Sequence, residues 1–415
     1  MKRVVVTGLG ALTPIGNNLQ AYYDGLQNGI SGAAPITRFD NTEFKTKFAC
    51  EVKDFTPEDH LDRRELRRMD LYAQFAMVAA QEAIQHSGLN LEKLDLDRAG
   101  VIWGSGIGGL ATLEHEVTEH ANGSGTPRYN PFTVPKMIAD IAAGLISIQF
   151  GFRGVNYATV SACASSSHAI AAAMDYIRLG RADVIITGGS EASVAKVGIG
   201  GFNAMKALST RNDDYKTASR PFDKDRDGFV LGEGAGALIL EEYEHAIQRG
   251  ATIYAEILGA GATADAHHMT APHPEGLGAM NVMKMAINDA KLNLEDIDYV
   301  NVHGTSTPLG DIAETIAIKR VFGDHATQLN ISSTKSMTGH LLGAAGAIES
   351  IAGIMALNHG IVPPTINHFT DDPEIDNALN LTFNEAQERD INYILSNTFG
   401  FGGHNSSLVF GKFKG

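Results

Sequence analysis

The chain has 415 residues, of which 44% are hydrophobic and 20% are charged, so it can bury a large core and is not a disordered chain. Its formal net charge of −15 argues against a nucleic acid as the main partner, because phosphate binding needs a broad basic surface. No apolar segment reaches the length of a membrane span, and two cysteines cannot build a disulfide framework, so we expect a cytoplasmic protein with no membrane partner.

Strand-like and helix-like segments alternate along the whole chain, which predicts an α/β fold with a mainly parallel sheet architecture. The predicted strands lie near residues 3–7, 100–104, 157–161, 184–188, 235–241, 253–260, 299–302, 329–333, 393–396 and 407–410. Helices are expected at 164–179, 276–291, 308–321 and 340–358. Pro308 suits the first position of its helix, and Asp311 and Glu314 follow in the early turns, where negative charge is favoured.

Both halves of the chain offer a strand, a reactive residue and an amphipathic helix. We therefore predict a repeated architecture with one half at 1–250 and the other at 251–415, although the two halves share little residue identity. No low-complexity linker separates them, which favours a single packed unit.

An arginine-rich segment, Arg63-Arg64-Glu65-Leu66-Arg67-Arg68, precedes a helical run that extends to about Gln85. Such a segment is typical of a solvated helix face. On an acidic protein it is also the local basic patch that an acidic partner would need.

Two segments imitate ligand-binding motifs. Residues 104–109 form a G-x-G-x-x-G pattern after a strand, but no second strand with a terminal acidic residue follows, so a tight turn explains it better than a nucleotide site. Residues 223–228 match the first half of a calcium loop, yet the twelfth position is Gly234 and supplies no carboxylate. His267 and His268 lack companions at zinc-ligand spacing.

Cys163 lies where the strand at 157–161 gives way to the helix at 164–179. The start of a helix carries free N–H groups and a partial positive charge, which favour a thiolate and would lower the pKa of the cysteine. The simpler interpretation is a small apolar core residue. Cys50 lies in a strand-like segment without an adjacent base and is expected to be inert packing.

Two histidines repeat this layout, because His303 follows the strand at 299–302 and His340 follows the strand at 329–333. A lone histidine is usually structural. Open α/β sheets, however, gather ligands and catalysis at the carboxyl ends of their strands. The three reactive side chains are therefore predicted to converge.

The segments Ala162–Ser165, Val302–Asp311, Lys335–His340 and Ser396–Asn405 together resemble the β-ketoacyl-acyl-carrier-protein synthases over nearly the whole chain. The chain is most similar to the stand-alone bacterial members that act in type II fatty acid synthesis. The resemblance implies a thiolase-type duplicated fold, layered α-β-α-β-α with two mixed sheets around central helices, and a homodimer. It also implies an acyltransferase that accepts an acyl group from acyl carrier protein, decarboxylates malonyl-carrier and joins the two.

The resemblance also implies roles for the reactive residues. Cys163 would be the acylated nucleophile, and His303 and His340 would serve malonyl decarboxylation as neutral N–H donors to the enolate. Lys335 and Glu349 would brace the histidines, and the positive charge of Lys335 would keep them neutral.

Further residues match the family by motif. Phe401 resembles a gate beside the thiol, with Phe399 next to it, and the N–H groups of Phe401 and Cys163 would form an oxyanion hole. The implied substrate-binding residues are Thr305, Thr307 and Thr270, of which the first two would contact the phosphopantetheine arm, with Ile107 and Phe202 at the acyl pocket. The implied carrier-protein docking patch is Arg64, Arg67, Arg68, Arg128 and Lys206. Asn301, Ser396 and Asn397 match positions around a structural Na⁺ or K⁺ in the family. The resemblance implies that the chemistry requires no cofactor. The phosphopantetheine arm would be brought by the carrier protein.

Several rivals are weighed against this interpretation. A degradative thiolase needs a second cysteine near the C-terminus, and none follows Cys163. Chain-initiating and chalcone-type synthases use one histidine and one asparagine, so His340 argues against them. A polyketide-type ketosynthase and a non-catalytic carrier-protein-binding homologue stay as alternatives. His404 stands where some relatives carry threonine.

Overall fold

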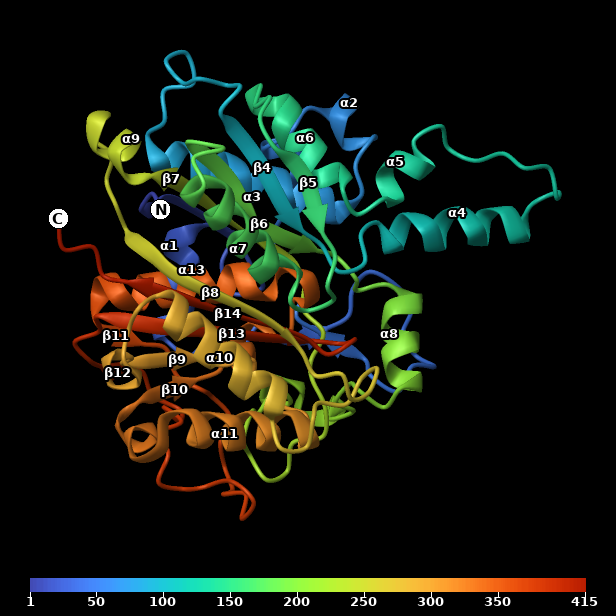
Figure 1. The fold of residues 1–415 in the computed structure, drawn as a ribbon. Coiled ribbons are helices and arrows are strands. Elements are labelled where there is room, and N and C mark those ends of the chain that lie inside the picture. Colours follow the sequence, from blue (N-terminus) through green and yellow to red (C-terminus); the bar gives the residue numbers. More distant parts are fainter.

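The computed structural model describes residues 1–415, and ten of the strands form one hydrogen-bonded sheet (Figure 1). The order is β10-β9-β13-β14-β8-β1-β7-β6-β4-β5. The strands of the first half are β1 (Val4–Leu12), β4 (Ala99–Gly104), β5 (Asn156–Thr159), β6 (Val184–Glu191) and β7 (Gly234–Glu242). Those of the second half are β8 (Ala255–Ala264), β9 (Tyr299–Asn301), β10 (Asn330–Ser332), β13 (Tyr393–Gly400) and β14 (His404–Gly411).

The two half-sheets are joined only where β1 meets β8, through the pairs Val5↔Glu256 and Val6↔Ala255. Within each half the pairing is mixed. β4 runs parallel to β5 and β6, and β9 runs parallel to β10 and β13, whereas β1, β7, β8 and β14 pair antiparallel. The expectation of mainly parallel strands is therefore wrong, while the expected mixed sheets are present and linked edge to edge.

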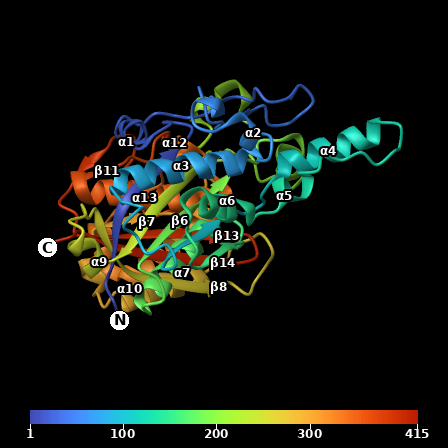
Figure 2. The same ribbon diagram turned by 90° about the horizontal axis from the view of Figure 1, so that it is seen from above.

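Helices form layers on both sides of each half-sheet (Figures 1 and 2). α7 (Ser165–Arg178) and α13 (Ala345–His359) lie in the centre and contact strands of both halves. The outer layers are α3 (Leu71–Ser87) and α6 (Ile141–Phe150) on the first half, and α10 (Leu277–Asp289) and α11 (Pro308–Phe322) on the second. The largest hydrophobic core surrounds the two central helices. The predicted layered α-β-α-β-α architecture is confirmed.

Small residues let the central helices approach the sheet closely. A Cβ on Gly353 of α13 would lie 2.2 Å from Cδ1 of Ile394 in β13, and one on Gly346 would lie 1.9 Å from Oγ of Ser167 in α7. A larger side chain at either position would push α13 away from its neighbours, and this helix carries Glu349 toward the candidate site.

Shorter elements complete the fold. The remaining helices are α1 (Leu19–Gln27), α2 (Arg63–Leu66), α4 (Leu110–Asn122), α5 (Thr133–Met137), α8 (Lys196–Ala204), α9 (Tyr243–Gln248) and α12 (Lys335–Thr338). Two small sheets pair β2 (Ala34–Pro35) with β3 (Phe48–Ala49) and β11 (Ile361–Val362) with β12 (Gln387–Glu388). The 3-10 turns are Pro57–Asp59, Asn212–Thr217, Leu294–Asp296, Gly323–Gln328 and Leu342–Ala344. α4 and α5 form an arm that projects from the body (Figures 1 and 2), and no helix is both long and apolar enough to cross a membrane.

One predicted helix boundary is displaced. The helix expected at 340–358 begins only at Ala345, because His340 forms a β-bridge with Leu231 and a 3-10 turn follows. Cys50 is fully buried, and burial raises the pKa of its thiol to about 12, in agreement with inert packing.

Candidate active site

Cys163 lies in the tight turn between β5 and α7. Ala162 just before it has a φ of +50°, which L-residues rarely adopt. The side chain of Ser165 holds this turn, because its Oγ accepts from Ser161 N at 2.9 Å and donates to Ala162 O at 2.7 Å. The turn thereby fixes the direction of the cysteine side chain.

The two histidines converge on this sulfur, as predicted. His340 Nε2 lies 3.0 Å from Cys163 Sγ. His303 packs edge-on against His340, with ring centroids 5.2 Å apart. Ligand atoms of all three residues lie within 4.8 Å of one another. Residues that are separated by up to 177 positions in the sequence thus meet at one point.

Lys335 and Glu349 form a fully buried ion pair beside the histidines. Burial, together with the positive charge of Lys335, holds the pKa of His303 and of His340 well below the usual value near 6.5. Burial raises the pKa of Glu349 to about 7, against the opposing effect of Lys335. Both imidazoles are therefore neutral at physiological pH, although burial contributes more to this than the lysine that the sequence singled out.

The pKa of Cys163 contradicts the expectation from the helix start. Burial raises the pKa of the thiol to about 12, and the charge of Lys335 and the backbone N–H of Phe401 only partly oppose it. The resting group is a thiol rather than a thiolate. Forming the nucleophile requires a proton acceptor, and His340 Nε2 is the nearest basic atom.

The backbone N–H groups of Cys163 and Phe401 lie beside the sulfur and are free to bind an oxyanion. Neither Cys163 N nor Phe401 N donates to another backbone group. The glycine at position 400 permits this approach, because a Cβ there would lie 3.0 Å from Cys163 N. Phe399 packs against His303 with centroids 5.7 Å apart. The arrangement suits an oxyanion that forms on a carbonyl attached to Cys163.

A cavity of about 630 Å³ leads to these groups. Its lining includes all five of the predicted substrate residues, namely Ile107, Phe202, Thr270, Thr305 and Thr307. The Oγ1 atoms of Thr305 and Thr307 lie 3.0 Å apart. A thiol, two imidazoles and threonine hydroxyls therefore share one cavity with apolar walls.

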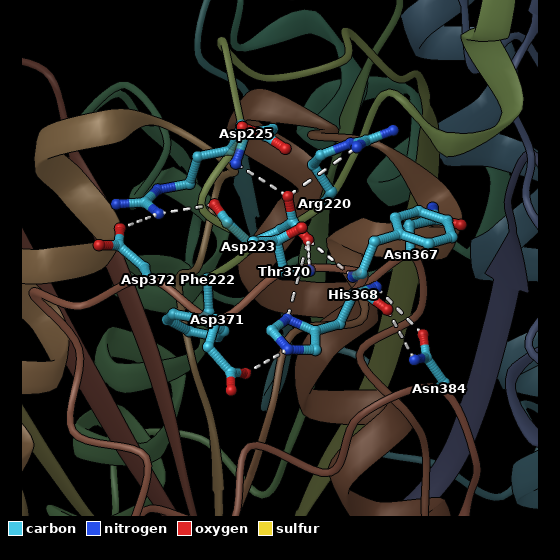
Figure 3. A network of polar contacts seen from close by, with 12 residues as sticks. Arg220, Phe222, Asp223, Asp225, Asn367, His368, Thr370, Asp371, Asp372 and Asn384 are labelled. Atoms are coloured by element: carbon cyan, nitrogen blue, oxygen red, sulfur yellow. Dashed lines mark hydrogen bonds and ion pairs between the residues drawn. The ribbon is translucent and has the colours of Figure 1, made fainter.

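In the segment that resembles a calcium loop, Asp223 instead belongs to a network of polar contacts with Arg220, His368 and Thr370 (Figure 3). The carboxylate of Asp223 accepts from Phe369 N at 2.7 Å and from Thr370 N at 2.8 Å. Arg226 donates to Thr307 O at 3.1 Å. Arg226 thus holds the turn that carries Thr305 and Thr307, while Asp223 holds the segment at 369–370.

Three residues at the site were not found by sequence reasoning. Phe229 lines the cavity and packs edge-on against His340, at a centroid distance of 5.4 Å. Glu314, noted only as favourable for the helix start, accepts from His303 N at 2.9 Å and Gly304 N at 2.8 Å. Glu191 is buried behind the cavity wall. No local motif marks Phe229 or Glu191, whereas the acidic first turns of α11 gave a partial signal for Glu314.

The predicted docking residues are all exposed and form no ion pair within the chain; they are Arg64, Arg67, Arg68, Arg128 and Lys206. Arg68 lies over the ring of Phe132 at 5.2 Å, which links the segment after α2 to the residue before α5. Lys206 also lines the cavity. The patch therefore extends from the arm to the cavity entrance.

Of the predicted cation residues, two have unpartnered buried oxygens. Asn301 Oδ1 and Ser396 Oγ lack hydrogen-bond partners, and the two residues pair directly across β9 and β13. Glu349 Oε2 is also buried without a hydrogen-bond partner. Buried oxygens without partners are the kind of ligand that a hard cation takes. The side chain of Asn397 does not join them, because its Oδ1 accepts from Ser407 Oγ at 2.7 Å.

Comparison with known proteins gives matches along the chain. The family models described as beta-ketoacyl synthase N-terminal domain and C-terminal domain match residues 1–246 and 254–369. A 3-oxoacyl-[acyl-carrier-protein] synthase 2 of Staphylococcus aureus is 50% identical, with 100% of this chain and 99% of the relative covered.

Solved structures agree with these matches. A beta-ketoacyl synthase from Burkholderia phymatum is similar with a TM-score of 0.92 and 36% identity over 100% of both chains. The type II polyketide complex AntDE:AntF, described as an acyl-carrier protein in complex with its ketosynthase, is similar with a TM-score of 0.90 and 34% identity over 100% of both chains.

Proposed function

Since this chain belongs to the β-ketoacyl synthase family, we propose that it catalyses the decarboxylating condensation of type II fatty acid synthesis. It is an acyltransferase that joins an acyl group to the two-carbon unit left by a malonyl thioester and forms a 3-oxoacyl-carrier thioester. One observation carries the proposal: the sulfur of Cys163 and a ring nitrogen of each of His303 and His340 lie within 4.8 Å of one another at the cavity.

In the first half-reaction the acyl group moves to Cys163. His340 Nε2 accepts the thiol proton across 3.0 Å, and the sulfur attacks the thioester carbonyl. The N–H groups of Cys163 and Phe401 stabilise the resulting oxyanion. When the tetrahedral intermediate collapses, the carrier thiolate leaves and takes the proton back from His340, which restores the neutral ring.

In the second half-reaction malonyl-carrier loses CO₂, and the enolate oxygen accepts hydrogen bonds from His303 and His340. Neutral rings suit this role, because a charged ring would protonate the enolate. The Nδ1 atoms of both rings lack partners. No contact therefore fixes one tautomer. After the ring exchanges its proton with solvent in the cavity, His340 Nε2, which accepts a proton in the first half-reaction, can donate a hydrogen bond in the second.

The enolate carbon then attacks the carbonyl of the acyl-Cys163 thioester. The new carbon–carbon bond forms and the carbon–sulfur bond breaks, so Cys163 leaves as a thiolate, which takes up one proton from solvent in the cavity to restore the thiol. Lys335 and Glu349 do not react in this scheme. The charge of Lys335 adds to burial in holding the histidine pKa values down, and Glu349 pairs with that charge inside the protein.

Acyl carrier protein is the proposed partner. Five exposed cations without intramolecular ion pairs suit an acidic surface. The similar ketosynthase in the AntDE:AntF structure is described in complex with its acyl-carrier protein, which supports the same kind of partner here.

A second copy of the chain is the proposed subunit partner. β5 is the last strand of the large sheet, so its outer edge has no strand beside it. Nearby, Ile148 is 79% exposed and Val160 is 61% exposed. An antiparallel pairing of two β5 strands would continue the sheet and cover these side chains.

Two further proposals concern a bound cation and the cellular compartment. Asn301 and Ser396 would hold a structural Na⁺ or K⁺ that neutralises local charge, with no part in the chemistry. Two free cysteines suit a reducing compartment, and we place the reaction in the cytoplasm.

Reconstitution tests the proposed function. The purified protein is mixed with malonyl-carrier and acyl-carrier, and both CO₂ and the 3-oxoacyl product are measured. Product that is one two-carbon unit longer supports the proposal. Carrier binding without CO₂ release or product would favour a non-catalytic homologue, and repeated extension without reduction would favour a polyketide-type enzyme.

A further inference from the structure

Glu191 is a fully buried carboxylate at the end of β6 that binds two loops at once. Its Oε2 accepts from Gly106 N at 2.8 Å and from Gly343 N at 3.0 Å. Its Oε1 accepts from Ile107 N at 3.2 Å and from Ser105 Oγ at 3.3 Å. One side chain thus joins segments of the chain that are more than 200 residues apart in sequence.

Each of these loops supplies an apolar wall of the cavity. Ile107 comes from the loop at 105–108, and Leu342 comes from the loop that follows His340. Leu342 has a φ of +46°, a conformation that needs support from its surroundings. The next residue, Gly343, is the one that donates to the carboxylate. The bonds to Glu191 therefore act directly on the backbone that carries both wall residues.

Two glycines are required for this arrangement. A Cβ on Gly106 would lie 2.8 Å from Glu191 Oε2, and one on Gly343 would lie 2.7 Å from the same oxygen. A side chain at either position would displace the carboxylate or separate the loops. The G-x-G-x-x-G pattern at 104–109 thus serves the close approach of a backbone to a carboxylate rather than to a nucleotide.

The charge of Glu191 is balanced by N–H dipoles instead of a cation. Burial raises the pKa of this carboxyl to about 7, and the groups that oppose the rise are backbone N–H groups, those of Gly106, Gly343 and Ile107 among them. An ionised carboxylate can only accept hydrogen bonds, which matches four surrounding donors. A neutral amide cannot satisfy all of them.

We propose that Glu191 is a positioning residue that fixes Ile107 and Leu342 as walls of the acyl cavity and thereby sets the discrimination between acyl chains of different length. The inference rests on the proposed condensing function. It assigns Glu191 no contact with the reacting atoms, and it predicts an effect on acyl selection that is separate from an effect on malonyl decarboxylation.

Glu191→Gln tests this inference. In either orientation the amide NH₂ faces an N–H of the loop at 105–108, so the wall is released from at least one bond. We measure kcat/KM for a series of acyl-carriers from hexanoyl to palmitoyl, and CO₂ release from malonyl-carrier alone. We expect the ratio between the best and the neighbouring chain lengths to fall at least about 10-fold, because one methylene in a fitted pocket is worth about 10- to 200-fold. CO₂ release should change less than about 3-fold, since the histidines keep their places.

Glu241→Gln is the matched control. Glu241 is also a fully buried carboxylate, and it pairs with Val184 at the opposite end of β6, where Thr7 and Arg249 bind it. This variant should keep the wild-type chain-length profile whatever it does to stability. If Glu191→Gln does not fold, Ser105→Ala takes its place, because it removes one donor to the same carboxylate. Its kcat/KM is measured over the same series of acyl chain lengths, and the same flattening is expected.

The outcomes are distinguishable. A flattened profile with retained CO₂ release supports the inference. An unchanged profile, or an equal loss of both activities in a folded variant, overturns it. A wild-type protein that fails to condense would instead overturn the proposed function on which the inference rests.

Discussion

Replacing His303 or His340 by alanine should slow different steps of the reaction. Both rings donate to the enolate, so each variant should slow malonyl decarboxylation about 10²- to 10³-fold, the usual effect of removing one oxyanion donor. Only His340 is hydrogen bonded to Cys163 Sγ. With a thiol pKa of about 12, the thiolate fraction at pH 7 is about 10⁻⁵ without a proton acceptor. Acylation of Cys163 should therefore slow strongly in His340→Ala and only weakly in His303→Ala.

The assay separates these steps. Intact mass against time gives the acylation rate, and CO₂ release from malonyl-carrier gives the decarboxylation rate. His325→Ala is the control, because His325 lies outside the cavity lining and bonds only to Ile297 O. Wild-type acylation in His340→Ala, or near-normal CO₂ release in either variant, would refute the assigned roles.

Four further results are expected. Cys163→Gln should abolish condensation but retain CO₂ release, and any elongation by this variant would exclude Cys163 as the acyl carrier. Because the pKa values of His303 and His340 lie well below 6.5 and the neutral rings are the active form, CO₂ release by Cys163→Gln should stay level as the pH falls from about 8 to about 6; a midpoint near 6.5 would contradict the neutral-donor role. Replacing Arg64, Arg67 and Arg68 by glutamate should raise KM for acyl-carrier about 10-fold or more with little change in kcat. A KM equal to that of the wild type would show that these arginines do not bind the carrier protein. Val160→Arg, at the exposed residue just after β5, should shift sedimentation toward the monomer, and an unchanged dimer would place the interface elsewhere.

Much of the fold followed from local patterns. The strands that end before the reactive residues were predicted closely, since β9 covers Tyr299–Asn301 and β10 covers Asn330–Ser332. Strand ends at one sheet edge were enough to predict that Cys163, His303 and His340 meet. Strand direction was harder, because sequence periodicity carries no information on which strands pair antiparallel.

The electrostatics of the site could be predicted only in part, because the neutral histidines beside Lys335 were expected but the raised pKa of Cys163 was not. The position of Cys163 before a helix suggested a low pKa, but burial dominates and raises it. Glu191 escaped notice for a related reason. Its partners are backbone N–H groups of distant loops, and no side-chain motif records such contacts.

The most direct test of the central claim is peptide mapping by mass spectrometry after incubation with acyl-carrier. We predict an acyl adduct on Cys163 alone, and its disappearance when malonyl-carrier is added. No adduct, an adduct on Cys50, or an adduct on Cys163 that malonyl-carrier leaves in place would contradict the claim that this thiol and the two neutral imidazoles act together.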